Sequence, residues 1–353
     1  MKKIVYLGMI VLVFNACVNN KKDQDYKLKL GKVPLTAKFI DNDWYIWGGS
    51  VVEKDGQYHM FYSRWPKKYH FSAWLTYSEI AHAVSDSPFG PFKYKDTPFP
   101  ARGVEYWDGL NTHNPTVKEF NGKYYIYYTG TTGNREIVEK GLNWVNRNNQ
   151  RIGVAVADHP NGPWQRFDKP LLEMPTDSLA HDALMMANPS VTRHPDARYV
   201  LVYKCVGKKR KLPGGGPVVH MVAFSDSPTG PFKKYPNPIF TAEGYDFPAE
   251  DPYIWTQGDK LYAIVKDFKG TFTKSGQSLA LFESIDGIDW KLSKNSLVST
   301  MKIEWENRTQ KVKHLERPQL FLQNGKPVAL MCASDTLDAN GVIQSFNVQI
   351  PIK

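Results

Sequence analysis

The chain has 353 residues, of which 42% are hydrophobic and 13% aromatic, so it can bury a large core and does not have the composition of a disordered protein. Its net charge of +10 is scattered over short clusters such as residues 208–211, which argues against a nucleic-acid-binding protein. We expect most of the basic residues to be solvated, although the excess is compatible with an anionic polysaccharide as partner.

The N-terminus has the form of an export signal. Two lysines precede an apolar run over residues 4–14, and the small residue Ala16 precedes Cys17. The run is too short for a permanent membrane span. It resembles a bacterial lipoprotein signal, which implies that Cys17 carries the lipid; the alternative is an ordinary cleaved signal with an incidental cysteine. We therefore predict a signal peptide over 1–17, a flexible tether over 18–38, and an exported lipoprotein anchored to a membrane, in the periplasm or at the cell surface.

From residue 39 to the end, one phrase occurs five times. Its second residue stands at 49, 115, 189, 252 and 318, in the contexts GGSVV, NPTV, NPSV, DPYI and RPQL. Each copy is followed by a turn and an aromatic, alternating segment, which predicts a β-hairpin. The turns are 55–56, 121–122, 195–196, 258–259 and 324–325.

Three repeats then add a third strand that ends in a nearly identical turn, at 85–92, 157–164 and 225–232, and the fourth has a relative of it at 284–290. One period thus holds about four short strands, the content of one propeller blade. The sequence predicts an all-β fold, a five-bladed β-propeller of four-stranded blades over residues 39–353.

In a propeller the innermost strand of each blade lines the central channel, so equivalent residues of the five phrases should converge. The residues in question are Gly48, Asn114, Asn188, Asp251 and Arg317, with Trp47, His113, Ala187, Glu250 and Glu316 one position earlier. Such acids suit the cleavage of an acetal, which needs a proton donor and a second carboxylate. A structural alternative is that the acids form ion pairs with Arg317 that close the ring.

The repeated phrases, above all AEDPYI and HLERPQL, resemble those of the five-bladed propeller glycosidases of glycoside hydrolase families 43 and 117. The resemblance implies an inverting mechanism with an aspartate base from the first blade. Gly48 occupies that place here, so we expect Asp43 to be the base, with Asp41 second; either could instead be a turn residue.

The proton donor differs between the two families. Family 117 implies His314 as the acid, with Glu316 or Asp251 as its partner, whereas family 43 implies a glutamate, here Glu250 or Glu316. Asp251 matches the aspartate that tunes the acid.

Sugar binding should use aromatic faces and polar groups near the channel. The residues predicted for this role are Trp47, Arg64, Trp107, His113, Asn114, Asn188 and Arg317. No cofactor is required, and no catalytic metal site is expected; His113 with Asp108 or Asp182 could hold a structural divalent cation in the channel.

Together these features predict an exo-acting, inverting glycoside hydrolase that removes terminal sugars from plant or algal oligosaccharides or polysaccharides. The alternatives are a carbohydrate-binding propeller without catalysis and a polysaccharide lyase. We assign no function to Cys205 and Cys332, which we expect to be buried free thiols rather than a disulfide.

Overall fold

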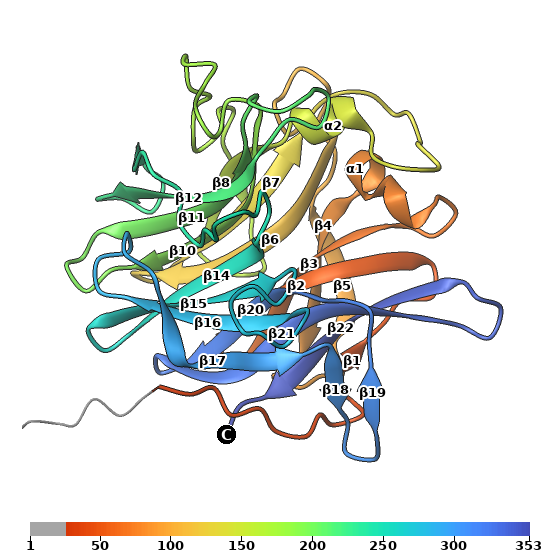
Figure 1. Ribbon diagram of the computed structural model, residues 1–353. Coiled ribbons are helices and arrows are strands. Elements are labelled where there is room, and N and C mark those ends of the chain that lie inside the picture. The colour runs from red at the N-terminus through yellow and green to blue at the C-terminus, as the bar shows by residue number, and fades with distance from the viewer. Residues whose placement is uncertain (1–25) are drawn as a thin grey trace, which may run out of the picture.

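The computed structural model describes residues 26–353, which form a ring of five sheets around a central channel (Figure 1). The first blade contains β2 (Trp44–Lys54), β3 (Gln57–Pro66), β4 (Glu79–Ser85) and β5 (Lys93–Phe99). The second contains β6 (Asn111–Phe120), β7 (Lys123–Thr131), β8 (Arg151–Ala157) and β9 (Gln165–Arg166). The third contains β10 (Met185–Arg193), β11 (Tyr199–Val206), β12 (Val218–Ser225) and β13 (Lys233–Lys234).

The fourth blade contains β14 (Ala249–Gln257), β15 (Lys260–Asp267), β16 (Ser278–Ser284) and β17 (Lys291–Thr300). The fifth contains β20 (Leu315–Gln323), β21 (Lys326–Leu337), β22 (Ile343–Pro351) and, as its outer strand, β1 (Lys38–Phe39). A hairpin of β18 (Lys302–Glu304) and β19 (Thr309–Lys311) joins blades four and five. The helical segments are η1 (Phe71–Ala73), α1 (Trp74–Tyr77) and α2 (Trp144–Asn148). Over the described residues the prediction of five four-stranded blades is confirmed.

The predicted hairpins form because their turns accept the left-handed backbone. Asp55 and Gly56 have φ of 53° and 79°, and Asn121 and Gly122 have φ of 54° and 78°. Two successive positive φ angles are typical of the tight turns that match strand twist, and Asn, Asp and Gly adopt them most readily.

The apolar side chains of each blade pack against the next blade. One cluster joins Ile46 and Met60 of blade one to Phe321 of blade five, and another joins Phe61 to Ile126 of blade two. Similar clusters join blades two to three, three to four, and four to five. These interblade cores fix the ring, so that the inner strands meet at the channel.

The N-terminal segment closes the ring. β1 pairs with β22, so blade five takes its outer strand from the start of the propeller. Residues 26–37, expected to belong to a flexible tether, instead pack against blades four and five, because Leu28, Val33 and Ala37 bury their side chains there. Residues 1–25, with the predicted signal and Cys17, lie outside the described part.

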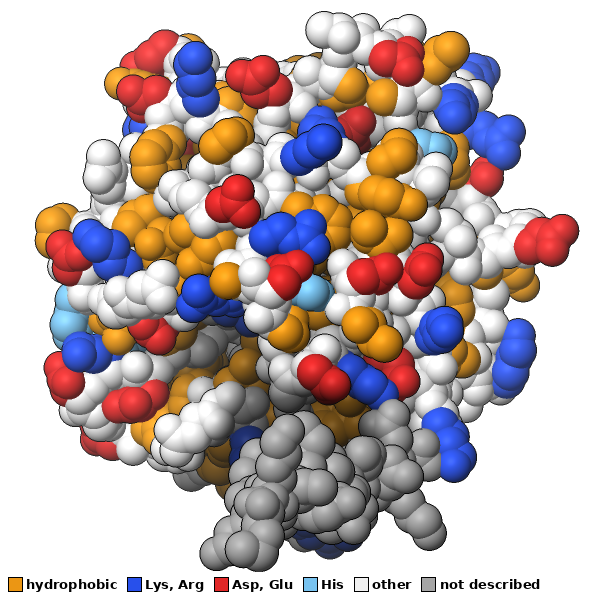
Figure 2. Space-filling view, turned by 90° about the vertical axis from the view of Figure 1, so that its left-hand side faces the viewer, with side chains coloured by type: hydrophobic (Ala, Val, Ile, Leu, Met, Phe, Trp, Pro, Cys, Tyr) orange, Lys and Arg blue, Asp and Glu red, His pale blue; other side chains and the backbone are white. Residues whose placement is uncertain are grey.

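Within residues 26–353, no helix has the length and apolarity needed to cross a membrane. Cys205 and Cys332 are both buried and unpaired, as expected. Basic and acidic side chains are interspersed on the face shown in Figure 2, in keeping with the scattered charge of the sequence.

Candidate active site

All five inner strands carry the same irregularity, and it positions the site. In each, the register with the second strand shifts at the repeated phrase. The residue at the bulge has a left-handed backbone, with φ between 51° and 58°, at Gly48, Asn114, Asn188, Asp251 and Arg317. Gly, Asn and Asp tolerate this region, whereas an arginine there is strained. The five equivalent positions are therefore related by the ring, as predicted.

Side chains at these bulges link neighbouring blades around the channel. Asn114 Nδ2 donates to Asn188 Oδ1 at 2.7 Å, and Asn188 Nδ2 donates to Asp251 Oδ1 at 2.7 Å. Arg317 closes the circuit: its backbone N–H donates to Asp251 Oδ2 at 3.1 Å, and its Nη2 donates to the Asn114 carbonyl at 3.3 Å. Asp251 and Arg317 thus form the buried ion pair of the structural alternative, at 3.3 Å.

Blade one contributes no side chain to this circuit, because Gly48 makes room for Arg317. A Cβ at Gly48 would lie 3.1 Å from Arg317 Cγ and 3.2 Å from its Cβ. The arginine of blade five therefore covers the place at which the resemblance implied an acid from blade one.

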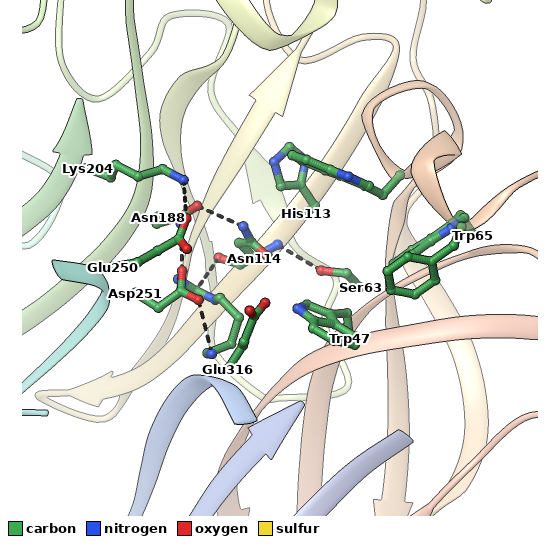
Figure 3. Close-up of a pocket in the computed structure, with 13 residues that line it drawn as sticks. Trp47, Ser63, Trp65, His113, Asn114, Asn188, Lys204, Glu250, Asp251 and Glu316 are labelled. Atoms are coloured by element: carbon green, nitrogen blue, oxygen red, sulfur yellow. Dashed lines mark hydrogen bonds and ion pairs between the residues drawn. The ribbon is translucent and has the colours of Figure 1, made fainter. Parts of the chain in front are cut away.

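A pocket opens beside this ring (Figure 3). One side, which we call the aromatic wall, comes from blade one and consists of Trp47, Trp65, Phe71 and Trp74. The other side, the charged wall, comes from blades three to five and consists of Lys204, Glu250, Asp251, Glu316 and Arg317. Ser63, His113, Asn114 and Asn188 complete the lining.

Equivalent positions on the second strands reach toward the inner strand of the next blade. Ser63 and Thr129 accept hydrogen bonds from the backbone N–H groups of Asn114 and Asn188, at 2.8 and 2.9 Å. In blades three and four the equivalent residues are lysines, which bind carboxylates instead. Lys204 Nζ binds Glu250 Oε1 at 2.9 Å, and Lys266 Nζ binds Glu316 Oε1. Each glutamate of the charged wall is thus held by a lysine of the preceding blade.

These contacts shift the pKa values of the acids in opposite directions. Burial raises the pKa of Glu316, whereas the positive charge of Lys266 lowers it. The negative charges of the nearby Glu250 and Asp251 raise the pKa of Glu316 as well, so that it stays above its ordinary value. Burial would also raise the pKa of Asp251, but Arg317, Lys204 and Lys266 outweigh it and hold that pKa below its usual range. Glu316 therefore keeps its proton to higher pH than an ordinary glutamate, whereas Asp251 loses its proton at lower pH than an ordinary aspartate.

His113 lies between the two walls as a neutral group. Its side chain is buried, neither ring nitrogen has a hydrogen-bond partner, and the Trp74 ring covers it with centroids 5.2 Å apart. Burial lowers its pKa to about 3, and the charges of Arg317 and Lys204 add to this effect.

Two loops support the aromatic wall. The segment after β3 carries Phe71 and Trp74 and is joined to the segment after β7 by several hydrogen bonds, among them those from Ser72 Oγ to the Val138 carbonyl at 3.0 Å and from Thr76 Oγ1 to the Glu136 carbonyl at 3.1 Å. These contacts help to hold Phe71 and Trp74 at one side of the pocket.

The predicted base does not reach the pocket. Asp43 is exposed in the turn before β2, where its N–H donates to Asp41 Oδ1 at 2.9 Å. Asp41 Oδ1 also accepts from the N–H of Trp44 at 3.1 Å. Both aspartates are therefore turn residues, the alternative considered from the sequence, and neither lines the pocket.

His314 lies at the edge of the site. Its ring is 6.1 Å from that of Trp47, but it does not line the pocket. Its partner is Asp335, whose Oδ1 lies 2.8 Å from Nδ1, and not Glu316 or Asp251 as expected.

Two residues predicted to bind sugar also lie elsewhere. Arg64 is buried in blade one, where Nε donates to Glu79 at 2.8 Å and the guanidinium stacks on Trp44. Trp107 packs against Tyr128 in blade two, and its Nε1 donates to the Phe167 carbonyl at 3.1 Å. Both side chains serve packing within their blades, whereas Trp47, His113, Asn114, Asn188 and Arg317 do line the pocket.

The acids suggested for a structural cation have other partners. Asp108 binds Arg102 at 2.7 Å and Arg166 at 2.6 Å, and Asp182 binds Lys234 at 2.6 Å. In the described part of the chain, no group of three or more His, Cys, Asp or Glu side chains is arranged to hold a metal ion.

Comparison with known proteins supports the fold. No protein-family model and no curated protein matches the chain. Solved structures do: a family 117 glycoside hydrolase of the marine bacterium Zobellia galactanivorans has a TM-score of 0.61 at 16% identity, over 92% of this chain and 90% of that one. The native arabinanase of Bacillus subtilis has a TM-score of 0.55 at 13% identity, over 88% and 95%.

The catalytic domain of a family 62 α-L-arabinofuranosidase from Coprinopsis cinerea has a TM-score of 0.57 at 10% identity, over 92% and 97%. The predicted resemblance to families 43 and 117 is thereby confirmed at the level of the fold. The chain shares the five-bladed β-propeller architecture of these glycoside hydrolases.

Proposed function

We propose that the protein is a glycoside hydrolase whose chemistry is performed by the charged wall. The observation that carries this proposal is the pairing of Glu250 and Glu316 with Lys204 and Lys266 at one side of a pocket whose other side is aromatic. An acetal is cleaved by a proton donor and a second carboxylate, and a sugar ring presents an apolar face to aromatic side chains.

Glu316 is the proton donor in this proposal. A general acid must be protonated at the working pH, and burial raises the pKa of Glu316 in that direction. Lys266, buried behind it, binds the same carboxylate and keeps it in place. The acid is thus a glutamate, as family 43 implied, rather than His314.

Glu250 is the second carboxylate, which activates water. It lies on the neighbouring inner strand, with Lys204 at 2.9 Å to orient it. Asp251 stays charged and binds the Arg317 guanidinium, so it acts on the protonation of its neighbours and not as a reacting group.

We further propose that the enzyme is exo-acting and inverting. The loop after β3, which holds Phe71 and Trp74 at one side of the pocket, supports a site closed on that side for a terminal sugar. The inverting mechanism is the one that the resemblance to families 43 and 117 implies, and the proposed substrates are terminal sugars of plant or algal oligosaccharides.

The test is a screen of purified protein against such oligosaccharides, with products followed by reducing-end analysis and by proton NMR of the newly formed anomer. We expect release of a single terminal sugar, first seen as the inverted anomer. An unsaturated product absorbing in the ultraviolet would identify a lyase, and sugar binding without products would identify a binding module.

We also propose that the protein is exported and lipidated at Cys17, on the strength of the apolar run that ends at Ala16. Wild-type protein should then partition with membranes and take up labelled fatty acid. Recovery of soluble wild-type protein, unchanged by Cys17→Ser, would contradict this.

A further inference from the structure

The N-terminal segment forms a distinct face of the molecule, which we call the strap face. It consists of residues 26–38, the β18–β19 hairpin and the C-terminal residues 351–353. Val33 N–H donates to the Glu304 carbonyl at 2.8 Å, and Lys353 N–H donates to the Lys29 carbonyl at 2.8 Å. These contacts hold the three segments side by side, at the bottom of the view in Figure 1.

The strap face is strongly basic. Residues 26–40 contain four lysines and no acid, so these 15 residues supply four positive charges in a chain whose net charge is +10. Lys27, Lys29 and Lys32 are exposed, and so is Arg308 at the tip of the hairpin. Burial lowers the pKa of Lys38, and the charge of Arg308 lowers it further, so these two cations share the face. The acids of the hairpin are Glu304, which binds Lys302 at 2.7 Å, and Glu306.

An apolar side chain projects from the same segment. Leu35 is 57% exposed, in a turn closed by the Ala37 N–H and the Pro34 carbonyl at 3.0 Å. Lysines beside an exposed leucine can combine attraction to anionic headgroups with a small apolar contact.

The part of the strap face around Thr36 lies at the end of blade one opposite the pocket, whereas the β18–β19 hairpin connects the end of β17 with the start of β20, both at the pocket end of their blades. Thr36 packs against Gly90, in the turn that follows β4. The end of β4, Ser85, pairs with Tyr58 beside the β2–β3 turn, whereas Trp47 of the pocket lies near the other end of β2. A membrane that contacted the segment at Thr36 would therefore touch blade one at the end remote from its pocket residues.

The position of Cys17 adds a constraint. Eight residues lie between it and Tyr26, the first described residue, and the nine steps along the chain span at most about 32 Å when fully extended. A lipid on Cys17 would hold the strap face within that distance of a membrane.

We propose that the strap face binds the headgroups of anionic phospholipids, so that the propeller sits on the membrane. This inference does not depend on the proposed glycosidase activity. Each lysine near an anionic bilayer contributes roughly a fivefold increase in affinity, and the attraction weakens as salt screens it.

The test uses residues 18–353, which contain every strand of the closed ring but neither the apolar signal nor a lipid. Sedimentation with vesicles of 30% phosphatidylglycerol in phosphatidylcholine should pull the protein down at low salt. Vesicles of phosphatidylcholine alone should not, and 0.5 M sodium chloride should release it.

The variant Lys27→Glu, Lys29→Glu, Lys32→Glu should lose more than a hundredfold in affinity. The matched control reverses three exposed lysines of the segment after β11, with Lys208→Glu, Lys209→Glu, Lys211→Glu, and should bind nearly as wild type. Circular dichroism checks that both are folded, and the salt dependence of the wild type tests the proposal without any variant.

Failure of the wild type to bind anionic vesicles at low salt would overturn the proposal, as would equal losses in the two variants. Binding to soluble polygalacturonate but not to vesicles, lost in the strap variant, would assign the face to a polysaccharide and also overturn it.

Discussion

The two walls of the pocket are built by different means from the same repeated fold. The charged wall comes from equivalent positions of successive blades, so Lys204 with Glu250 repeats in Lys266 with Glu316. The aromatic wall comes from blade one alone, and Phe71 and Trp74 belong to a loop that no other blade copies.

In the proposed function this difference assigns chemistry to one wall and recognition to the other. In blades one and two the second strands carry a hydroxyl residue at the equivalent position, which accepts from a backbone N–H group and serves the fold. A lysine at the same position in blades three and four brings paired ions to the channel instead. The propeller thus carries charged groups at the channel without a change in its backbone.

The strongest expected contrast is between the glutamates and the aspartate first expected as base. Glu316→Gln and Glu250→Gln should each lower turnover by about a hundred- to ten-thousandfold, since removal of general acid or base catalysis has that effect. Asp43→Asn should leave turnover unchanged, because Asp43 lies in an exposed turn. Turnover is measured on a substrate identified by the oligosaccharide screen.

His314→Ala belongs to the same series. Its imidazole contacts Asp335 at the rim, so we expect less than a tenfold loss. A large loss of turnover in His314→Ala, with turnover retained in Glu316→Gln, would show that the histidine and not Glu316 is the proton donor.

Lys266→Met should move the pH profile. Lys266 opposes the raised pKa of Glu316, so its removal should raise that pKa further and extend activity to higher pH. The alkaline limb of kcat/KM measures this directly. It should also destabilise the fold, because the carboxyl group loses its ion-pair partner. Lys266→Arg, which keeps the charge, should restore much of the profile.

The raised pKa of Glu316 also makes the free energy of unfolding depend on pH. Since the folded pKa of Glu316 lies above its unfolded value near 4.3, the folded state binds the proton more tightly. Its contribution to the free energy of unfolding is therefore complete below that pH and is lost as pH rises through the folded pKa. A flat contribution from this group, seen by comparing wild type with Glu316→Gln in urea at several pH values, would count against the assignment.

Trp47→Ala should affect binding and not chemistry. Loss of an aromatic face that stacks on a sugar should raise KM about tenfold with kcat little changed. Trp44→Ala is the matched control: the residue lies on the same strand but contacts Arg64 and not the pocket. Equal effects of the two variants on KM would remove the aromatic wall from recognition.

The smallest expected effect concerns the bulge of blade one. Gly48→Ala should lower the free energy of unfolding by about 2 kcal/mol, because it combines a left-handed residue with contact against Arg317. Gly56→Ala has φ of 79° but no neighbour within 4 Å, so it should cost only about 1 kcal/mol. Urea denaturation measures both, and equal losses would mean that Gly48 does not accommodate Arg317.

The repeated phrase was sufficient to predict the fold and the convergence of the inner strands, because equivalent residues of a ring must meet. The left-handed bulges were foreseeable too, since Gly48, Asn114, Asn188 and Asp251 are residue types that favour positive φ. Lys204 and Lys266 could have been found by comparing the ends of the second strands, where they replace Ser63 and Thr129.

Other parts of the site could not be predicted in this way. Asp43 lies five residues before Gly48 in the sequence. Five residues of an extended strand span about 17 Å, so Asp43 is too far along the chain to reach the channel. Phe71 and Trp74 come from a loop without a repeat. Contacts with residues 136–138 and the packing of Phe71 on blade one place this loop beside the pocket. Arg64 and Trp107 are residue types that often bind sugars, but here their side chains contact other residues of their own blades.

The most direct test of the two-wall account is a crystal structure of the Glu316→Gln variant with an oligosaccharide found in the screen. We predict one sugar ring against Trp47, with the glycosidic oxygen within about 3 Å of the residue 316 amide and a water held by Glu250. A sugar bound away from this pocket, or a glycosidic oxygen turned toward the aromatic wall, would contradict it.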